Sequence, residues 1–188
     1  PTFYSIAIVL VLILPILTMR IFSEERKLHT FELLMTSPIG TNEIVVGKFL
    51  GVYTVYLGLL LMTGLVPLTL SFFCSFDWNP VMTGYLGLAL MGALFLSTGM
   101  FASALTDNQV VAGFISFGLL LILWLLGGVG ALLGDAPIGK VLSYLSFFEH
   151  NDRLFRGLID TQDLIYYLSG MVMMLFLAHR VVESQRWK

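Results

Sequence analysis

The apolar residues of this chain are gathered into long runs, and those runs constrain the fold more than any other feature. Five segments meet or approach the roughly 20 residues that an α-helix needs to cross a bilayer. They cover about residues 3–19, 49–76, 81–105, 110–133 and 164–178. We therefore predict an all-α protein, a polytopic membrane helix bundle with five spans in this chain.

The charged residues are scarce and avoid these runs. Only 12% of the 188 residues are charged, against roughly 25% in a soluble domain. No predicted span has an ionisable residue in its core, which disfavours a proton- or sodium-coupled transporter. The three histidines, His29, His150 and His179, lie at or beyond span ends, which disfavours haem or metal binding within the bilayer. We expect them to be solvated surface residues. With Cys74 as its single cysteine, the chain forms no internal disulfide.

The basic residues predict how the chain is oriented. Residues 20–48 carry four of the ten basic side chains, and residues 180–188 carry three. Because membrane proteins concentrate Lys and Arg on the cytoplasmic side, both segments are predicted to be cytoplasmic, with residue 1 outside. One more upstream span would return the N-terminus to the cytoplasm, so we expect six spans in the full-length protein.

The polar segment between the first two spans has the pattern of a short helix. Ser23 is a candidate helix cap, and Glu24 and Glu25 suit the positive end of the helix dipole. Apolar side chains follow on one side at helical spacing: Leu28, Phe31, Leu34 and Met35. Residues 36–40, with Pro38, break this pattern, and a second helix can begin at residues 41–43 and run into the next span. The segment could lie passively on the lipid or serve as a docking surface for a cytoplasmic partner.

Local irregularities are expected within the spans. Pro15 and Pro67 predict kinks, which membrane helices tolerate when neighbouring groups satisfy the freed carbonyl. The small-residue pairs at residues 47–51 and 130–134 would permit close approach of helices. Lys48 does not belong to a phosphate-binding loop, because the glycine spacing is wrong and no hydroxyl residue follows it. We predict that Lys48 extends to the lipid headgroups.

The second polar segment, residues 135–163, mixes aromatic and charged residues and is too polar to span a membrane. Its aromatic residues suit the membrane–water interface. We predict a structural lid of short interfacial or re-entrant helices, with Asp152, Arg153 and Arg156 in a local ion-pair network. His150, Asp152 and Arg153 are the only cluster that could support a lipid-modifying or redox activity, for which no catalytic motif is found.

The run from Pro15 to Phe49 resembles the permease subunits of ABC-2 type exporters, particularly the gliding-motility-associated group. Their pattern is matched by Pro15, Leu17 to Arg20, Glu24 to Arg26, Thr30, Glu32 to Leu34, Pro38, Ile44-Val45 and Gly47-Lys48. His29 departs from it, because a glycine is expected there. Further stretches, such as SALTDNQVVAG, extend the resemblance over nearly all of the chain.

The resemblance implies a single transmembrane permease domain over residues 1–188, in which residues 22–40 form a cytoplasmic coupling segment and residues 135–163 an external segment. It implies a dimer of ABC ATP-binding subunits as partner, a second permease half that is identical or related, and an accessory membrane protein. Substrate would move by alternating access across the bacterial cytoplasmic (inner) membrane. ATP and magnesium would bind to the partner subunit. This chain would be no enzyme and would bind no cofactor, metal or nucleic acid.

Two sets of residues carry these assignments. The coupling residues are Glu24, Glu25, Arg26, Leu28, Thr30, Phe31, Glu32, Leu34 and Met35. The external gate candidates are Phe147, Phe148, Arg153 and Phe155. The alternative function is an integral membrane scaffold or a lipid-modifying membrane enzyme that transports nothing.

Overall fold

The computed structural model describes residues 2–28, 40–73, 77–134 and 136–185, and within these every regular element is an α-helix. Among the described residues, five helical stretches are long and apolar enough to cross a membrane. They are Phe3–Lys27, Thr41–Ser71, Trp78–Leu105, Gln109–Leu133 and Thr161–Ser184. The predicted all-α class and the five spans are confirmed. The helices extend beyond most of the predicted apolar limits, because helical backbone continues into the polar flanks.

Helix α6 (Trp78–Leu105) forms the centre of the bundle. It packs against α1 (Thr2–Thr18), α4 (Thr41–Thr63), α7 (Gln109–Leu133) and α10 (Thr161–Gln185). About 78% of its most apolar stretch is buried in the protein, whereas the other four spans bury between 11% and 33%. The outer helices therefore keep most of their apolar surface for lipid, and α6 positions the other elements.

Small residues on α6 allow this close packing. An added Cβ would lie 2.6 Å from Phe3 Cζ at Gly84, 2.6 Å from Tyr56 Oη at Gly92, and 2.6 Å from Thr18 Cβ at Gly99. Real Cβ contacts are essentially never that short, so a larger residue would force the Phe3 or Tyr56 ring to move at Gly84 or Gly92 and would force the helices apart at Gly99. Helix association in membranes depends on such packing, because lipid tails are as apolar as the side chains themselves. The predicted pair at residues 47–51 has open space around both glycines and joins no helices.

The second span is interrupted near Pro67, as predicted. Helix α4 ends at Thr63, and α5 (Leu65–Ser71) begins directly after Gly64. Pro67 has no N–H to donate to the Thr63 carbonyl, so the hydrogen-bond ladder is broken at this turn. The ladder resumes at Leu68, whose N–H donates to the Gly64 carbonyl at 3.3 Å. Pro15, by contrast, lies inside α1, which continues to Thr18.

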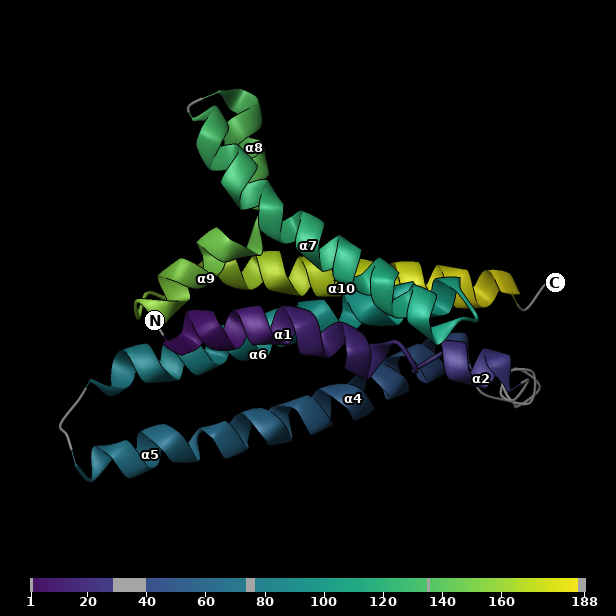
Figure 1. Ribbon diagram of the computed structural model, residues 1–188, viewed down its shortest axis with the longest axis horizontal. Coiled ribbons are helices and arrows are strands. Elements are labelled where there is room, and N and C mark those ends of the chain that lie inside the picture. Colours follow the sequence, from purple (N-terminus) through teal and green to yellow (C-terminus); the bar gives the residue numbers. More distant parts are fainter. Residues whose placement is uncertain (1, 29–39, 74–76, 135, 186–188) are drawn as a thin grey trace.

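The polar elements gather at the two ends of the bundle (Figure 1). One end holds α2 (Ser23–Lys27) and the end of α10, so Arg26, Lys27 and Arg180 lie on the same side, as expected. The other end holds the N-terminus and α9 (Phe147–Phe155). We call these the α2 end and the α9 end. That the α2 end faces the cytoplasm stays a prediction.

The segment after the fourth span contains two short helices, as predicted. Helix α8 (Pro137–Leu145) folds back along the end of α7, and this pair rises away from the other helices in Figure 1. The two helices pack closely, because a Cβ at Gly130 would lie 2.7 Å from the Ser143 nitrogen and one at Gly139 2.7 Å from the Gly134 oxygen. Helix α9 then returns to the bundle and packs on α6.

Candidate functional site

Helix α2 is a single turn that follows α1 at the α2 end. The chain leaves α1 through a turn in which the Ile21 N–H donates to the Thr18 carbonyl at 3.1 Å. A helix of five residues is not stable in isolation. The conformational entropy lost in forming its first turn exceeds the free energy gained from one turn of hydrogen bonds. Tertiary contacts must therefore fix α2. We call these contacts the α2 junction, formed by Glu25, Arg26, Lys48, Ser103 and Asp107.

Ser103 of α6 caps the start of α2 from a neighbouring helix. Its buried hydroxyl accepts hydrogen bonds from the backbone N–H groups of Phe22 and Ser23, at 3.0 and 3.1 Å. The same hydroxyl donates to the Met19 carbonyl at 3.1 Å. The prediction that Ser23 caps this helix is wrong, because its own hydroxyl donates to the Met19 carbonyl. The first N–H groups of α2 therefore depend on a residue about 80 positions away.

Two cations complete the junction. The Arg26 guanidinium lies 2.7 Å from the Asp107 carboxylate, in the turn between α6 and α7, and donates to the Ala104 carbonyl at 2.8 Å. Lys48 of α4 forms an ion pair with Glu25, donates to the Ile21 carbonyl at 2.9 Å and lies over the Phe22 ring. The prediction that Lys48 extends to headgroups is therefore wrong. The Glu25 carboxylate and the Ile21 carbonyl bind its ammonium group in place of the water or lipid phosphate that a lysine extending to the headgroups would contact.

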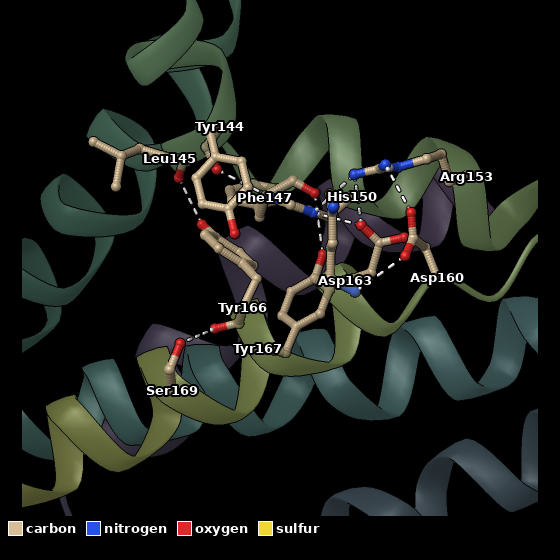
Figure 2. Close-up of polar contacts among 11 residues, drawn as sticks. Tyr144, Leu145, Phe147, His150, Arg153, Asp160, Asp163, Tyr166, Tyr167 and Ser169 are labelled. Atoms are coloured by element: carbon tan, nitrogen blue, oxygen red, sulfur yellow. Dashed lines mark hydrogen bonds and ion pairs between the residues drawn. The ribbon is translucent and has the colours of Figure 1, made fainter.

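A second polar cluster lies at the α9 end (Figure 2). It joins His150 and Arg153 of α9 to Asp160 and Asp163 at the start of α10, and we call it the α9 cluster. The Asp163 Oδ1 atom lies 2.8 Å from Arg153 Nη2 and 2.5 Å from His150 Nδ1. Arg153 also donates to Asp160 at 3.3 Å. This cluster clamps α9 to the last span.

The ring of His150 is fully engaged within the α9 cluster. Its side chain is only 1% exposed and stacks on Tyr166 at 4.1 Å, so the prediction of a solvated histidine is wrong for this residue. Nε2 lies 3.0 Å from the Tyr144 carbonyl, which can only accept, so this nitrogen carries a proton. Nδ1 lies 2.5 Å from Asp163 Oδ1 and 3.3 Å from Arg153 Nη2. Neither ring nitrogen is left to act as a base on a substrate.

A family model described as ABC-2 family transporter protein matches residues 2–182. The chain belongs to the ABC-2 transporter family. No curated protein and no solved structure matches the chain. The family match supports a multi-pass membrane component of an ABC transport system, and it covers both the α2 junction and the α9 cluster.

In this ABC-2 family chain, the coupling residues divide into two groups. Glu25 and Arg26 face inward and hold α2 to α4 and to the end of α6. Leu28 is 63% exposed and Glu24 is half-buried. Lys27, which is not one of the predicted coupling residues, is exposed beside Leu28. Helix α2 ends at Lys27, because the backbone at Leu28 leaves the helical region. The rest of the predicted amphipathic segment, from residue 29 on, lies outside the described residues. The other coupling candidates, Thr30, Phe31, Glu32, Leu34 and Met35, lie outside the described residues.

Three of the four gate candidates of the ABC-2 chain, Phe147, Arg153 and Phe155, take part in the packing of α9. Phe147 is buried against Phe95 of α6, with ring centroids 5.0 Å apart. Phe155 stacks on Phe3 of α1 at 5.3 Å. Arg153 belongs to the α9 cluster, and Phe148 lies in the same helix. These contacts fix α9 to the bundle, and a role in gating stays a prediction.

The predicted ion-pair network of the ABC-2 chain is only partly present. Arg156 pairs with Asp152 at 2.8 Å, one helical turn apart. Arg153 pairs with Asp160 and Asp163 instead of Asp152, because its side chain points to the start of α10. Asp152 accepts a hydrogen bond from the Tyr4 hydroxyl and so joins α9 to α1. The nominated catalytic trio of His150, Asp152 and Arg153 is thus split between two structural contacts.

Proposed function

We propose that this chain is the permease subunit of an ATP-driven export complex, which pairs with a second permease half and is driven by a separate ATP-binding subunit. Membership of the ABC-2 family supports the membrane component of this proposal. The α2 junction carries the coupling role, because one short helix is bound at once to Met19 after the end of α1, to α4, to α6 and to the α6–α7 turn. ATP and magnesium would bind to the partner.

Through the α2 junction, a displacement imposed by a partner subunit would be transmitted to the membrane-spanning helices. Lys27 and Leu28 present the outer side of α2, where a cytoplasmic subunit could press. Displacement of α2 would pull on Ser103 through two backbone hydrogen bonds and on α4 through Lys48. Because α6 contacts the other spans, a movement at its end reaches the whole bundle. Alternating access would follow when such a movement opens one end and closes the other.

At the α9 end, polar contacts hold the helices together and would restrict this movement. Asp163 binds α9 to α10, while Tyr4 and Asp152 bind α9 to α1. Both contacts must loosen before these three helices can separate. We therefore assign α9 the role of a closing element at the end away from the proposed ATPase.

The test is reconstitution of the complete transport complex with variants of α2. Leu28→Glu should lower co-purification of the ATP-binding subunit about tenfold, as expected for a charge placed in an apolar contact. Glu25→Gln should preserve subunit binding and lower the permease-stimulated ATP hydrolysis, since it loosens α2 from Lys48. Gln162→Glu, exposed at the opposite end, is the matched control and should change neither. Normal binding and hydrolysis in both α2 variants would refute the coupling role.

Transport itself separates the permease from the alternatives. A scaffold would bind the ATPase, but hydrolysis would not respond to any transported molecule. The gliding-motility association and the bacterial inner-membrane location follow only from the resemblance and the basic residues. A reporter fused after residue 188 tests the orientation, because activity of a cytoplasmic reporter requires the α2 end to face inward.

A further inference from the structure

A groove of about 540 Å³ lies between the start of α4 and the end of α10, at the α2 end of the bundle. Its walls are apolar on the membrane side, formed by Val45, Val46, Val172, Leu175 and Phe176. Its rim is polar, formed by Asn42, His179, Arg180 and Glu183. The groove therefore changes from apolar to charged along its length, as a bilayer leaflet does near its surface.

The rim holds charges of both signs side by side. Arg180 Nη1 lies 3.4 Å from Glu183 Oε2, and His179 Nδ1 lies 3.9 Å from the same carboxylate oxygen. The guanidinium of Arg180 lies over the Phe176 ring, 5.1 Å from its centroid, which places the cation above the apolar wall. The Arg180 and Glu183 side chains are 64% and 41% exposed. Such an exposed pair contributes little to stability, so a ligand with complementary charges can replace it.

We propose that this groove binds one glycerophospholipid whose headgroup carries a phosphate and a primary amine, as in phosphatidylethanolamine. The phosphate is bound by Arg180, with the planar guanidinium donating to its oxygens. The ammonium group donates to the Glu183 carboxylate. One acyl chain lies along the apolar wall.

The charge pattern selects this headgroup over two common alternatives. A purely anionic headgroup would satisfy Arg180 but would place its negative charge beside Glu183. A choline headgroup carries a quaternary ammonium that has no N–H to donate to that carboxylate. The apolar wall selects a lipid over a free phosphoamine, because Val172 and Phe176 are 59% and 53% exposed on a membrane-spanning helix. The site is separate from the α2 junction and does not depend on coupling to an ATPase.

The test is lipid retention by the full chain, purified in detergent with an equimolar mixture of phosphatidylethanolamine, phosphatidylcholine and phosphatidylglycerol that share the same acyl chains. Native mass spectrometry then counts each retained lipid. We expect about tenfold enrichment of phosphatidylethanolamine, the change that one hydrogen bond between charged groups provides. Glu183→Ala should abolish the preference, whereas Arg180→Ala should lower the retention of all three lipids, because each of them carries a phosphate. Arg156→Ala, which removes a similar exposed pair at the α9 end, should preserve both.

A second pair of variants tests the apolar wall without changing any charge. Val46→Trp fills the groove and should abolish retention, whereas Val55→Trp, on an exposed face of α4 away from the groove, should not. Equal retention of the three lipids, or unchanged retention in Val46→Trp, would overturn the proposal. Soluble phosphoethanolamine should not compete, because it lacks the acyl chain. Full displacement by this compound would overturn the lipid assignment as well.

Discussion

Gly99 lies where α6 crosses the end of α1, and its replacement by alanine tests how closely these helices approach. The new Cβ would lie 2.6 Å from Thr18 Cβ and closer still to its hydroxyl. Thr18 is completely buried, and its hydroxyl donates to the Leu14 carbonyl at 2.9 Å. Both colliding carbon atoms are attached to backbone, so no rotamer change relieves the contact. Overpacking typically costs about 1–3 kcal/mol, and we expect the upper value, about 3 kcal/mol, because the helices themselves must separate.

The assay is reversible unfolding in mixed micelles, followed by tryptophan fluorescence as the denaturing detergent fraction rises. Gly118→Ala on α7 is the matched control, because nothing lies within 4 Å of the added Cβ. The helix propensity of alanine should make this control neutral or up to about 1 kcal/mol more stable. Adding Thr18→Gly to Gly99→Ala moves the Cβ from one helix to the other and should restore about half of the lost stability. A loss below about 0.5 kcal/mol for Gly99→Ala would refute the packing argument.

Three further changes test the polar contacts and one turn by the same unfolding measurement. Ser103→Ala should cost about 2 kcal/mol, because two buried N–H groups lose their acceptor. Ser71→Ala, whose hydroxyl bonds only within its own helix, should change stability by less than about 0.5 kcal/mol. Asp163→Asn should cost about 3–5 kcal/mol, since the completely buried Asp163 carboxylate pairs with Arg153 and contacts His150. Asp160→Asn, at a carboxylate that is 43% exposed, should cost less than about 1 kcal/mol, and equal losses would contradict the burial argument. Gly157→Ala should cost about 1–2 kcal/mol, because φ is +89° there, and an unchanged midpoint would contradict that strain.

The spans were predictable because apolarity over 20 residues is a local property that requires no knowledge of neighbours. The restart of helix at residue 41 and the interruption near Pro67 were also predictable, since proline acts on its own turn. The glycines at which two helices meet were not predictable from the sequence. The pair at residues 47–51 fits the small-residue pattern but faces open space, whereas Gly92 and Gly99 mark crossings without belonging to a pair that we recognised. Which face of a helix meets another depends on the whole bundle.

The candidate site was likewise only partly predictable from the sequence. The position of helix α2 followed from the charge of its segment and from the family pattern, but the contacts of its residues did not. Ser103 is a small polar residue in an apolar helix, and nothing near it in sequence indicates that it caps α2. The sequence showed that Asp163 is an acidic residue next to the last span. It did not show that His150, rather than another residue, is its partner. The histidine was assigned to the surface because burial of a charged group requires a partner that local sequence does not reveal.

The sequence by itself determined that this chain is a helical membrane protein, how many spans it has and which family it belongs to. These properties depend on apolar length, on charge placement and on a pattern of residues along the chain. Only the tertiary structure decided that Lys48 binds Glu25, that Ser103 caps α2 and that His150 is buried against Asp163. Each of these contacts joins residues that are distant in sequence, and a polar group in an apolar bundle takes whichever partner the packing brings within reach.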